Sequence, residues 1–307
     1  MSEERQKTLL IIGGSGFIGQ ALSRYLLKKS WKIRILTRSH RPDPVVASCQ
    51  QFVWDGENIP AEAIGNCYGV VNLAGEPVAE GIWSTAKKDR ILNSRVRGAR
   101  ALTDAISKLE QKPQVVIQAS AVGYFGNGDH NRVCTESSAP GEGFLAQVCQ
   151  SWEQSAQDIS HMTRLCIARF GLVLARDGGA FPKLHGIYSL GLGAIPGHGK
   201  QWTNWIHIED VVSLLSRLLE DRNRAGVFHF CAPENSTFED MHRKICDYTL
   251  SVRGIKAPAL IVKLALGERS SLILDTPRVD SGKWEAELFS CPDLSSVFRD
   301  LMKPLSD

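Results

Sequence analysis

The first candidate for chemistry is a glycine-rich turn near the start of the chain. It reads Gly13-Gly14-Ser15-Gly16-Phe17-Ile18-Gly19 and follows the apolar run Thr8–Ile12. Glycines at positions 13, 16 and 19 have the spacing of a dinucleotide-binding fingerprint, where they permit a tight turn and close approach of a pyrophosphate. A helix after the turn would present free N–H groups and a partial positive charge to the phosphates. The turn therefore predicts a dinucleotide site; a purely structural glycine turn is the alternative.

The second candidate lies at the end of the next apolar run, Lys32–Thr37. Proteins that bind NAD usually have an acid about 20 residues after the glycine motif, where it binds the ribose 2′-hydroxyl. This run instead ends Thr37-Arg38-Ser39, without an acid. A guanidinium pairs with a phosphate through charge-assisted hydrogen bonds, and two hydroxyls flank Arg38. We therefore predict NADP(H) as the cofactor; a surface arginine without a ligand is the alternative.

Apolar runs that alternate with amphipathic segments must position both candidates. The pattern predicts strands over 8–12, 32–37, 69–73, 115–120 and 164–174, and helices over 17–29, 85–109 and 144–159. Strand–helix alternation is typical of a parallel sheet with right-handed crossovers. We expect an α/β fold with a Rossmann-type, doubly wound parallel sheet.

The pattern is looser in the last part of the chain. It predicts a helix over 208–220, a short strand over 227–230, and a capping box from Ser236 to Glu239 that begins a helix running to about Val252. We expect residues 1–175 to form the NADP-binding core, and residues 176–307 to complete the sheet and form a small C-terminal substrate lobe. Glycine-rich loops at 178–179 and 191–200 are expected to border the substrate cavity.

Composition narrows the range of partners. Lys and Arg number 36 against 33 Asp and Glu, a net charge of +3, so no concentrated basic stripe for nucleic acid is indicated. None of the eight cysteines is spaced C-x-x-C, so we expect no metal site and reduced thiols. No run approaches the ~18–20 apolar residues of a transmembrane helix. We expect a cytoplasmic protein that binds a small-molecule substrate and neither nucleic acid nor membrane.

Several further motifs carry a family resemblance. They are Asn72-Leu73-Ala74-Gly75-Glu76, Ser94-Arg95-Val96, Ala119-Ser120-Ala121-Val122-Gly123-Tyr124, Trp152-Glu153, Arg169-Phe170-Gly171-Leu172-Val173-Leu174 and Trp205-Ile206-His207-Ile208-Glu209-Asp210. With the glycine turn, these motifs resemble the extended short-chain dehydrogenases. More narrowly, the chain is similar to an uncharacterised epimerase-like group found in bacteria and eukaryotic organelles. The resemblance covers nearly the whole chain.

The resemblance implies a role for each matching residue. Backbone groups of Leu73, Ala74 and Gly75 would line the cofactor, and Asp55 would approach the adenine amino group, with an ordinary turn aspartate as the alternative. Arg95 would face the cofactor, with a surface arginine as its alternative. Ser120 would be the active-site hydroxyl beside the nicotinamide. Phe170 would pass the nicotinamide amide, unless it belongs to the core. A homodimer built from the two long central helices is also implied.

The chain departs from the family at the catalytic Tyr-x-x-x-Lys pair. The helix after the Ser120 strand has Leu145 and Cys149 near the two positions, and neither replaces a phenol and an ammonium group. The only Tyr-x-x-x-Lys runs from Tyr25 to Lys29, in the wrong helix. Tyr124 is our candidate proton donor, with a packing role as the alternative. Glu76 is a candidate substrate contact.

For some further polar and aromatic residues, a structural role is a better interpretation than a role in the site. His207 and Asp210 are expected to form a cap and a buried hydrogen bond, and Trp202 and Trp205 are expected to pack in the core or a lid. Glu142 and Lys183 are weaker candidates for the site. Two hypotheses therefore stay open. One is an NADP(H)-dependent oxidoreductase or epimerase with an atypical acid/base arrangement; the other is a catalytically weak protein that binds NADP(H) for regulation or sensing.

Overall fold

The computed structural model describes residues 6–126 and 132–303. Its central sheet has seven strands, all parallel, in the order β12-β7-β5-β4-β1-β2-β3. The strands are β1 (Thr8–Ile12), β2 (Lys32–Thr37), β3 (Gln50–Val53), β4 (Gly69–Asn72), β5 (Val115–Ala121), β7 (Arg164–Phe170) and β12 (Gly226–Phe230). The predicted Rossmann-type α/β fold is confirmed.

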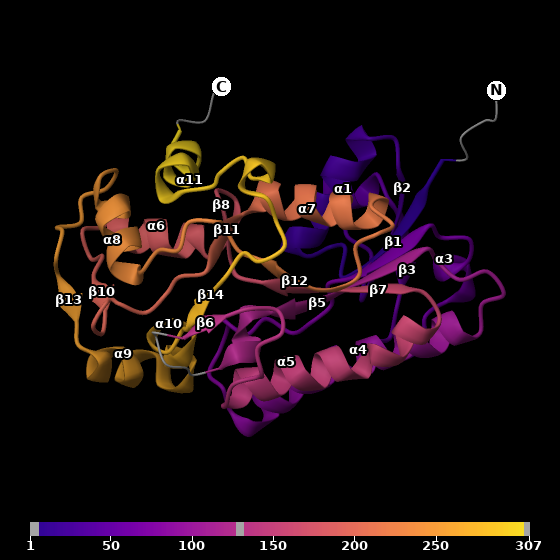
Figure 1. Cartoon of the computed structure of the whole chain (residues 1–307), viewed down its shortest axis with the longest axis horizontal. Helices are drawn as coiled ribbons and strands as arrows, with labels where there is room; N and C mark the ends of the chain where they lie inside the picture. Colours follow the sequence, from indigo (N-terminus) through magenta and orange to yellow (C-terminus); the bar gives the residue numbers. More distant parts are fainter. Residues whose placement is uncertain (1–5, 127–131, 304–307) are drawn as a thin grey trace.

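Helices cover both faces of this sheet (Figure 1). On one face lie α1 (Phe17–Lys28) and α7 (Ile208–Glu220), and on the other lie α4 (Thr85–Ser107) and α5 (Phe144–Ser155). The short helices α2 (Pro44–Ala47) and α3 (Ala61–Ile64) lie in the connections around β3. Strand side chains such as Leu10 and Ile11 have no exposed surface, as expected for a sheet that is covered on both faces.

The C-terminal part adds short strands and helices at one end of the sheet. Strands β11 (Trp205–His207), β8 (Leu172–Ala175) and β9 (Gly178–Gly179) form a small sheet, β10 (Ile195–Pro196) pairs with β13 (Lys256–Ala257), and β14 (Arg278–Val279) pairs with β6 (Val133–Cys134). The helices are α6 (Phe181–Ser189), α8 (Phe238–Cys246), α9 (Ala259–Leu266), α10 (Ser271–Leu274) and α11 (Leu294–Leu301). Among the described residues, no helix is both long and apolar enough to cross a membrane.

The strand predicted over 164–174 is in fact two strands. The chain leaves the main sheet at Gly171, whose N–H donates to the Phe230 carbonyl, while the next N–H, of Leu172, donates to the Asn204 carbonyl. A Cβ atom at Gly171 would lie 1.8 Å from that Asn204 oxygen, so only glycine fits at the crossing. The apolar run therefore serves two sheets, a division that periodicity does not reveal.

The predicted capping box is shifted by one residue. Thr237 and Asp240 cap α8, whereas the Ser236 hydroxyl is buried and accepts a hydrogen bond from the Trp205 indole at 2.8 Å. The helix ends at Cys246 rather than near Val252, and the Ser251 side chain beyond it bonds the chain at Tyr188 and Gly193. Likewise α4 ends at Ser107, and α5 ends at Ser155 before the separate 3-10 helix η2 (Gln157–His161).

Candidate functional site

The glycine turn joins β1 to α1, as its spacing predicts. Gly13 has φ +79°, and its carbonyl accepts from the Gly16 N–H at 3.0 Å. A Cβ atom at Gly14 would lie 2.7 Å from Ile35, and one at Gly19 would lie 2.6 Å from the Gly14 Cα atom. These two glycines therefore permit close packing of turn, helix and strand.

Gly16 differs from its neighbours because the space beside it is open. The nearest atom to a Cβ there is the Gly13 carbonyl oxygen at 3.2 Å. Gly16 is also the N-cap of α1 and provides no side-chain cap. The first N–H groups of α1, beginning at Phe17 and Ile18, therefore have no partner inside the helix and are free for an anion.

The loop at 178–179, predicted to border the substrate cavity, lies against this turn. It forms β9, and a Cβ atom at Gly178 would lie 2.3 Å from the Phe17 ring. Phe17 thus packs beneath a second glycine pair, which covers the start of α1. The other loop with this prediction, 191–200, pairs with residues 255–257 through β10 and β13.

The end of β2 lies beside the turn. The Thr37 hydroxyl is buried, lies 3.2 Å from the Ser15 hydroxyl, and donates to the Ser39 carbonyl at 2.9 Å. Arg38 and Ser39 are exposed, and Arg38 has no ion-pair partner among the residues that the structure describes. A free guanidinium therefore lies at the position expected for a 2′-phosphate ligand.

Asp55 lies after β3 and forms a tight turn. One of its carboxylate oxygens accepts from the Asn58 and Glu57 N–H groups, at 3.0 Å and 2.8 Å. These hydrogen bonds hold the pKa of the exposed Asp55 carboxyl below its ordinary value. The neighbouring Trp54 N–H donates to the Thr37 carbonyl, so the turn is attached to the end of β2.

The segment after β4 contacts both the glycine turn and α4. A Cβ atom at Gly13 would lie 3.0 Å from the Ala74 nitrogen, so Leu73 and Ala74 pass directly beside the turn. A Cβ atom at Gly75 would lie 2.8 Å from the Arg95 guanidinium carbon. Arg95 is not a surface arginine: it contacts the Trp152 ring and donates to the Glu76 carbonyl at 3.0 Å.

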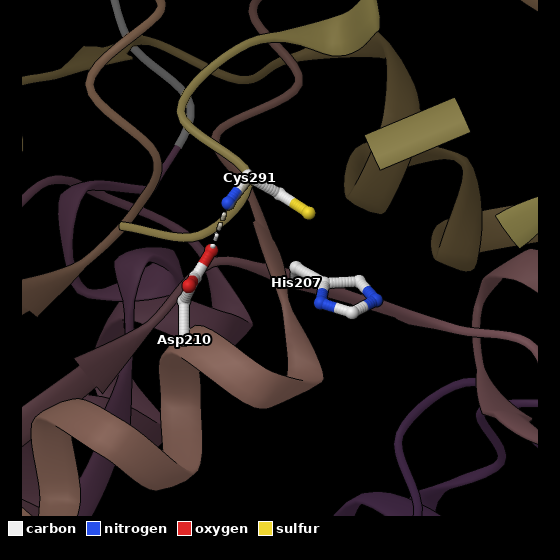
Figure 2. A group of neighbouring side chains, drawn as sticks. All are labelled: His207, Asp210 and Cys291. Atoms are coloured by element: carbon white, nitrogen blue, oxygen red, sulfur yellow. Dashed lines mark hydrogen bonds between the residues drawn. The ribbon is translucent and has the colours of Figure 1, made fainter. Parts of the chain in front are cut away.

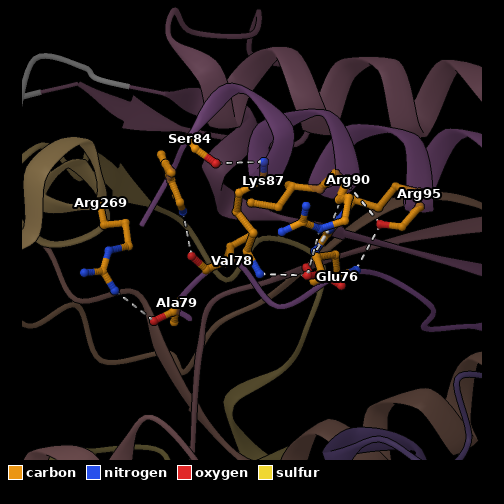
Figure 3. A network of polar contacts seen from close by, with 11 residues as sticks. Glu76, Val78, Ala79, Ser84, Lys87, Arg90, Arg95 and Arg269 are labelled. Carbon is orange, nitrogen blue, oxygen red and sulfur yellow. Dashed lines mark hydrogen bonds and ion pairs between the residues drawn. The ribbon is translucent and has the colours of Figure 1, made fainter. Parts of the chain in front are cut away.

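Glu76 is held in a network of α4 side chains (Figure 3). Its carboxylate accepts from Lys87 at 2.8 Å and lies 3.7 Å from Arg90, and its N–H donates to the Ser94 hydroxyl. The hydrogen bond from Lys87 lowers the pKa of Glu76 from its ordinary value. The predicted substrate contact is thus an ion-paired carboxylate that fixes the loop after β4.

Ser120 lies at the end of β5 in a buried ion-pair cluster. Its hydroxyl donates to one Glu153 oxygen at 2.6 Å, and Arg169 bonds both Glu153 oxygens, each at 2.8 Å. The Arg169 guanidinium carbon also lies 3.5 Å from the centroid of the Tyr124 ring. Ser120 and Tyr124, the two predicted catalytic residues, are therefore joined through Glu153 and Arg169.

Sequence reasoning assigned no role to Glu153 or Arg169, although both lie in the quoted motifs. A usable signal was present: an arginine inside the buried strand β7 requires a buried anion. The Glu153 carboxylate on the facing helix α5 meets that requirement. Because the Ser120 side chain is only 2% exposed, its proton is committed to Glu153 in this structure.

The positions of the missing catalytic pair are apolar or buried. Leu145 packs with Trp83 and Phe144, and burial raises the pKa of the Cys149 thiol to about 11. Tyr25 lies on α1 and Lys29 follows its last residue, and Lys29 donates to Ser216 of α7. Both helices lie on the face of the sheet opposite α5 (Figure 1). Neither pair supplies a phenol and an ammonium group beside Ser120.

The remaining candidate residues lie either in the core or on the surface. Phe170 is buried, with its ring centroid 4.9 Å from that of Phe230. Trp205 is 1% exposed and belongs to the core, as expected. Glu142 and Lys183 are exposed.

Figure 2 shows His207, Asp210 and Cys291, whose ligand atoms all lie within 4.8 Å of one another. Asp210 accepts from the Ser290 N–H and hydroxyl and from the Cys291 N–H, which is the buried hydrogen bonding that was predicted. His207 is the N-cap residue of α7, although its side chain makes no capping bond. Burial raises the pKa of Cys291 to about 11. Asp210 already accepts three hydrogen bonds from Ser290 and Cys291. The three side chains therefore fit a structural contact between α7 and the C-terminal segment better than a metal centre.

Comparison with known proteins identifies the family of this chain. The model of the NAD dependent epimerase/dehydratase family matches residues 9–229. An epimerase family protein of Staphylococcus saprophyticus is 36% identical over 96% of this chain and 99% of its own length. The chloroplastic SDR39U1 homolog of Arabidopsis thaliana, also named an epimerase family protein, is 32% identical over 90% of this chain and 81% of its own length.

A solved structure has the same fold throughout. The human epimerase family protein SDR39U1 (isoform 2) with NADPH superposes with a TM-score of 0.83 and 26% identity, over 96% of this chain and 99% of that one. The resemblance seen in the motifs is confirmed: this chain belongs to the NAD dependent epimerase/dehydratase family.

Proposed function

We propose that this chain binds NADP(H) across the carboxyl ends of β1, β2, β4 and β5. The pyrophosphate would lie on the turn Gly13-Gly14-Ser15-Gly16-Phe17-Ile18-Gly19. Arg38, with Thr37 and Ser39, would hold the 2′-phosphate, and Asp55 would approach the adenine. The single observation that carries this proposal is the exposed, unpaired Arg38 beside an open glycine turn, without an acid at the end of β2.

The rest of the cofactor would follow the segment after β4 toward β5. Backbone groups of Leu73, Ala74 and Gly75 would line the cofactor. Arg95 would hold that segment in place through its hydrogen bond to the Glu76 carbonyl. The nicotinamide would then lie near Ser120 and Phe170. The human relative named above was solved with NADPH, which supports this choice of cofactor.

We further propose an oxidoreductase that reduces activated carbonyl groups of a small molecule. Bound NADPH supplies a hydride. The chain's own contribution is limited, because Leu145 and Cys149 provide no acid and the Ser120 proton is donated to Glu153. Tyr124, with the Arg169 cation against its ring, is the remaining proton donor. A positioned acid typically contributes ~10²–10⁴-fold in rate, so substrates that demand little proton transfer are favoured.

The test is hydride transfer from NADPH to reactive dicarbonyls or quinones, compared with simple sugars. We expect turnover with the activated carbonyls and slow turnover with sugars. Tyr124→Phe should lower the rate with little change in NADPH affinity. Vigorous turnover of a simple sugar, unaffected by Tyr124→Phe or Ser120→Ala, would show that the catalytic groups lie elsewhere.

A second candidate is an NADP(H)-binding regulatory or sensor protein. The commitment of the Ser120 hydroxyl to the buried Glu153–Arg169 pair favours it, since that hydroxyl is then a structural group. In this case the bound cofactor keeps its redox state against the whole panel of carbonyls and sugars, while NADPH still binds.

We also propose a homodimer through α4 and α5. Their outer faces share a hollow of about 630 Å³, lined by residues such as Leu92, Val96 and Gln154. Two copies packed there would form a four-helix bundle. Light scattering of the full chain should then give twice the monomer mass, and Val96→Glu should return it to the monomer mass.

A further inference from the structure

Large apolar side chains gather on the surface of the C-terminal part, away from the cofactor site. Six of them lie between 63% and 80% exposed: Leu190, Leu192, Leu250, Val252, Leu260 and Leu264. They come from the loop after α6, the segment after α8, and helix α9. Figure 1 shows β10, β13 and α9 together at one end of the molecule. We call these six side chains the apolar face.

Hydrogen bonds join the segments that carry the apolar face. The Gly193 N–H donates to the Ser251 hydroxyl at 2.9 Å, and that hydroxyl donates to the Tyr188 carbonyl at 2.8 Å. The Ile195 N–H donates to the Ile255 carbonyl at 2.8 Å where β10 meets β13, directly before α9. These hydrogen bonds hold the loop after α6 against the segment after α8, and they hold β10 against β13 directly before α9.

Helix α9 has little of its apolar surface inside the protein. Its sequence is ALIVKLAL, and Val262 is its one buried residue. An apolar helix normally hides such side chains in a core, and a contiguous exposed apolar patch marks an interaction surface. Helix α9 therefore presents apolar side chains that are available to a partner.

The charges around the apolar face select the kind of occupant. Residues 187–200 and 248–266 contain Lys200, Arg253, Lys256 and Lys263 but no Asp or Glu. Neither Lys256 nor Lys263 has an ion-pair partner among the described residues. Three carboxylates near these segments are paired: Asp247 with Arg253, Glu268 with Lys88, and Glu239 with Arg243. Two copies joined through this face would place cations against cations.

We infer that the apolar face is a docking site for an anionic lipid surface. Leucine side chains would enter the boundary between headgroups and acyl chains, while Lys256 and Lys263 meet the headgroups. This departs from the expectation of no membrane partner, which rests on the absence of an apolar run long enough to span a bilayer. A near-neutral total charge conceals a local region without acidic residues, and docking on a bilayer needs no spanning helix.

The test is co-sedimentation of the full chain with vesicles of phosphatidylcholine alone or with about 30% phosphatidylserine. We expect binding to the anionic vesicles only, weakened by added salt because the attraction is partly screened. Lys256→Glu and Lys263→Glu should each weaken binding at least about fivefold, since each basic residue near the surface is worth about 1 kcal/mol. Leu260→Gln with Leu264→Gln should abolish binding.

Matched controls keep the outcome clear. Val53→Gln on β3, and Lys28→Glu with Lys108→Glu, alter exposed residues outside this face and should leave vesicle binding unchanged. Thermal unfolding and NADPH binding of every variant report that the fold persists. Equal binding to neutral and anionic vesicles, or binding that survives the leucine substitutions, would overturn the proposal. So would the absence of vesicle binding, including the case in which the leucines instead support a dimer.

Discussion

The two ends of the proposed cofactor site are built in opposite ways. At the glycine turn, Gly16 is open and Arg38 is exposed and unpaired. At the end of β5, the polar groups bond one another: Ser120 to Glu153, and Glu153 to Arg169. Groups at the first end are available to a ligand, whereas those at the second stabilise the protein itself.

In the proposed function, this difference is how a family fold would keep its cofactor site while its acid/base chemistry changes. Binding a dinucleotide needs backbone N–H groups and one well-placed cation, which remain here. Acid/base catalysis needs a titrating group at the substrate, and Cys149, buried with a pKa of about 11, does not provide one. Predictions about the two ends can therefore be tested separately.

The largest effect is expected from Gly16→Val. The branched side chain would fill the open space where the pyrophosphate approaches, so binding of NADPH and NADH should be lost. The nearest protein atom is a single carbonyl oxygen, so the fold should persist. Titration of cofactor fluorescence measures binding, and circular dichroism measures whether the fold persists.

Gly186→Val is the matched control, because nothing lies within 4 Å of a Cβ at Gly186. It should bind cofactor as the unmutated protein does. A folded Gly16→Val variant that still binds NADPH would show that the site is misplaced.

The next effect concerns stability at the other end. Glu153→Ala leaves Arg169 charged, buried and unpaired, which should cost about 3–5 kcal/mol of unfolding free energy. Urea unfolding measures the loss, and Glu62→Ala, at an exposed carboxylate, is the control. Because the two partners form one pair, Glu153→Ala and Arg169→Met together should cost less than the sum of the single changes. A loss below about 1 kcal/mol would mean that the pair is not structural.

A smaller effect is expected from Arg38→Ala. One charge-assisted pair is worth ~1.5–3 kcal/mol, or about 10- to 150-fold in affinity. The variant should lose that factor for NADPH while its NADH affinity changes little. Arg24→Ala, an exposed arginine on α1, should change neither affinity. Unaltered NADPH binding by Arg38→Ala would remove Arg38 from the site.

The smallest effect is a pH dependence of stability from His229. This residue lies on β12, beside Arg169 of the neighbouring strand β7. Burial lowers its pKa below the ordinary value of about 6.5. Below that pH the unfolded chain binds the proton more readily, so the free energy of unfolding should fall as pH drops through 6.5 toward the folded pKa. His229→Asn should flatten this slope, and His161→Asn, at an exposed histidine, should not. Equal slopes in all three proteins would contradict the assignment.

Local features of the site could be predicted from the sequence. The glycine turn depends on the strand before it and the helix after it, and α7 has the predicted bounds of 208–220. Thr37, Arg38 and Ser39 follow the next strand, so their position near the turn results from parallel pairing of neighbouring strands.

Features that depend on distant partners could not be predicted. The division at Gly171 depends on the backbone of Asn204, and the Glu153–Arg169 pair joins two elements whose contact no periodicity reveals. Either the Ser236 or the Thr237 hydroxyl could cap α8. The Trp205 indole donates to the Ser236 hydroxyl, and Thr237 is the N-cap residue. Such choices are made by packing rather than by propensity.

The most direct test of the central claim is the ratio of the NADH and NADPH dissociation constants of the unmutated protein at one ionic strength. If Arg38 holds a 2′-phosphate at an otherwise shared site, NADPH should bind about 10- to 150-fold more tightly than NADH. Equal dissociation constants, or a preference for NADH, would contradict the account.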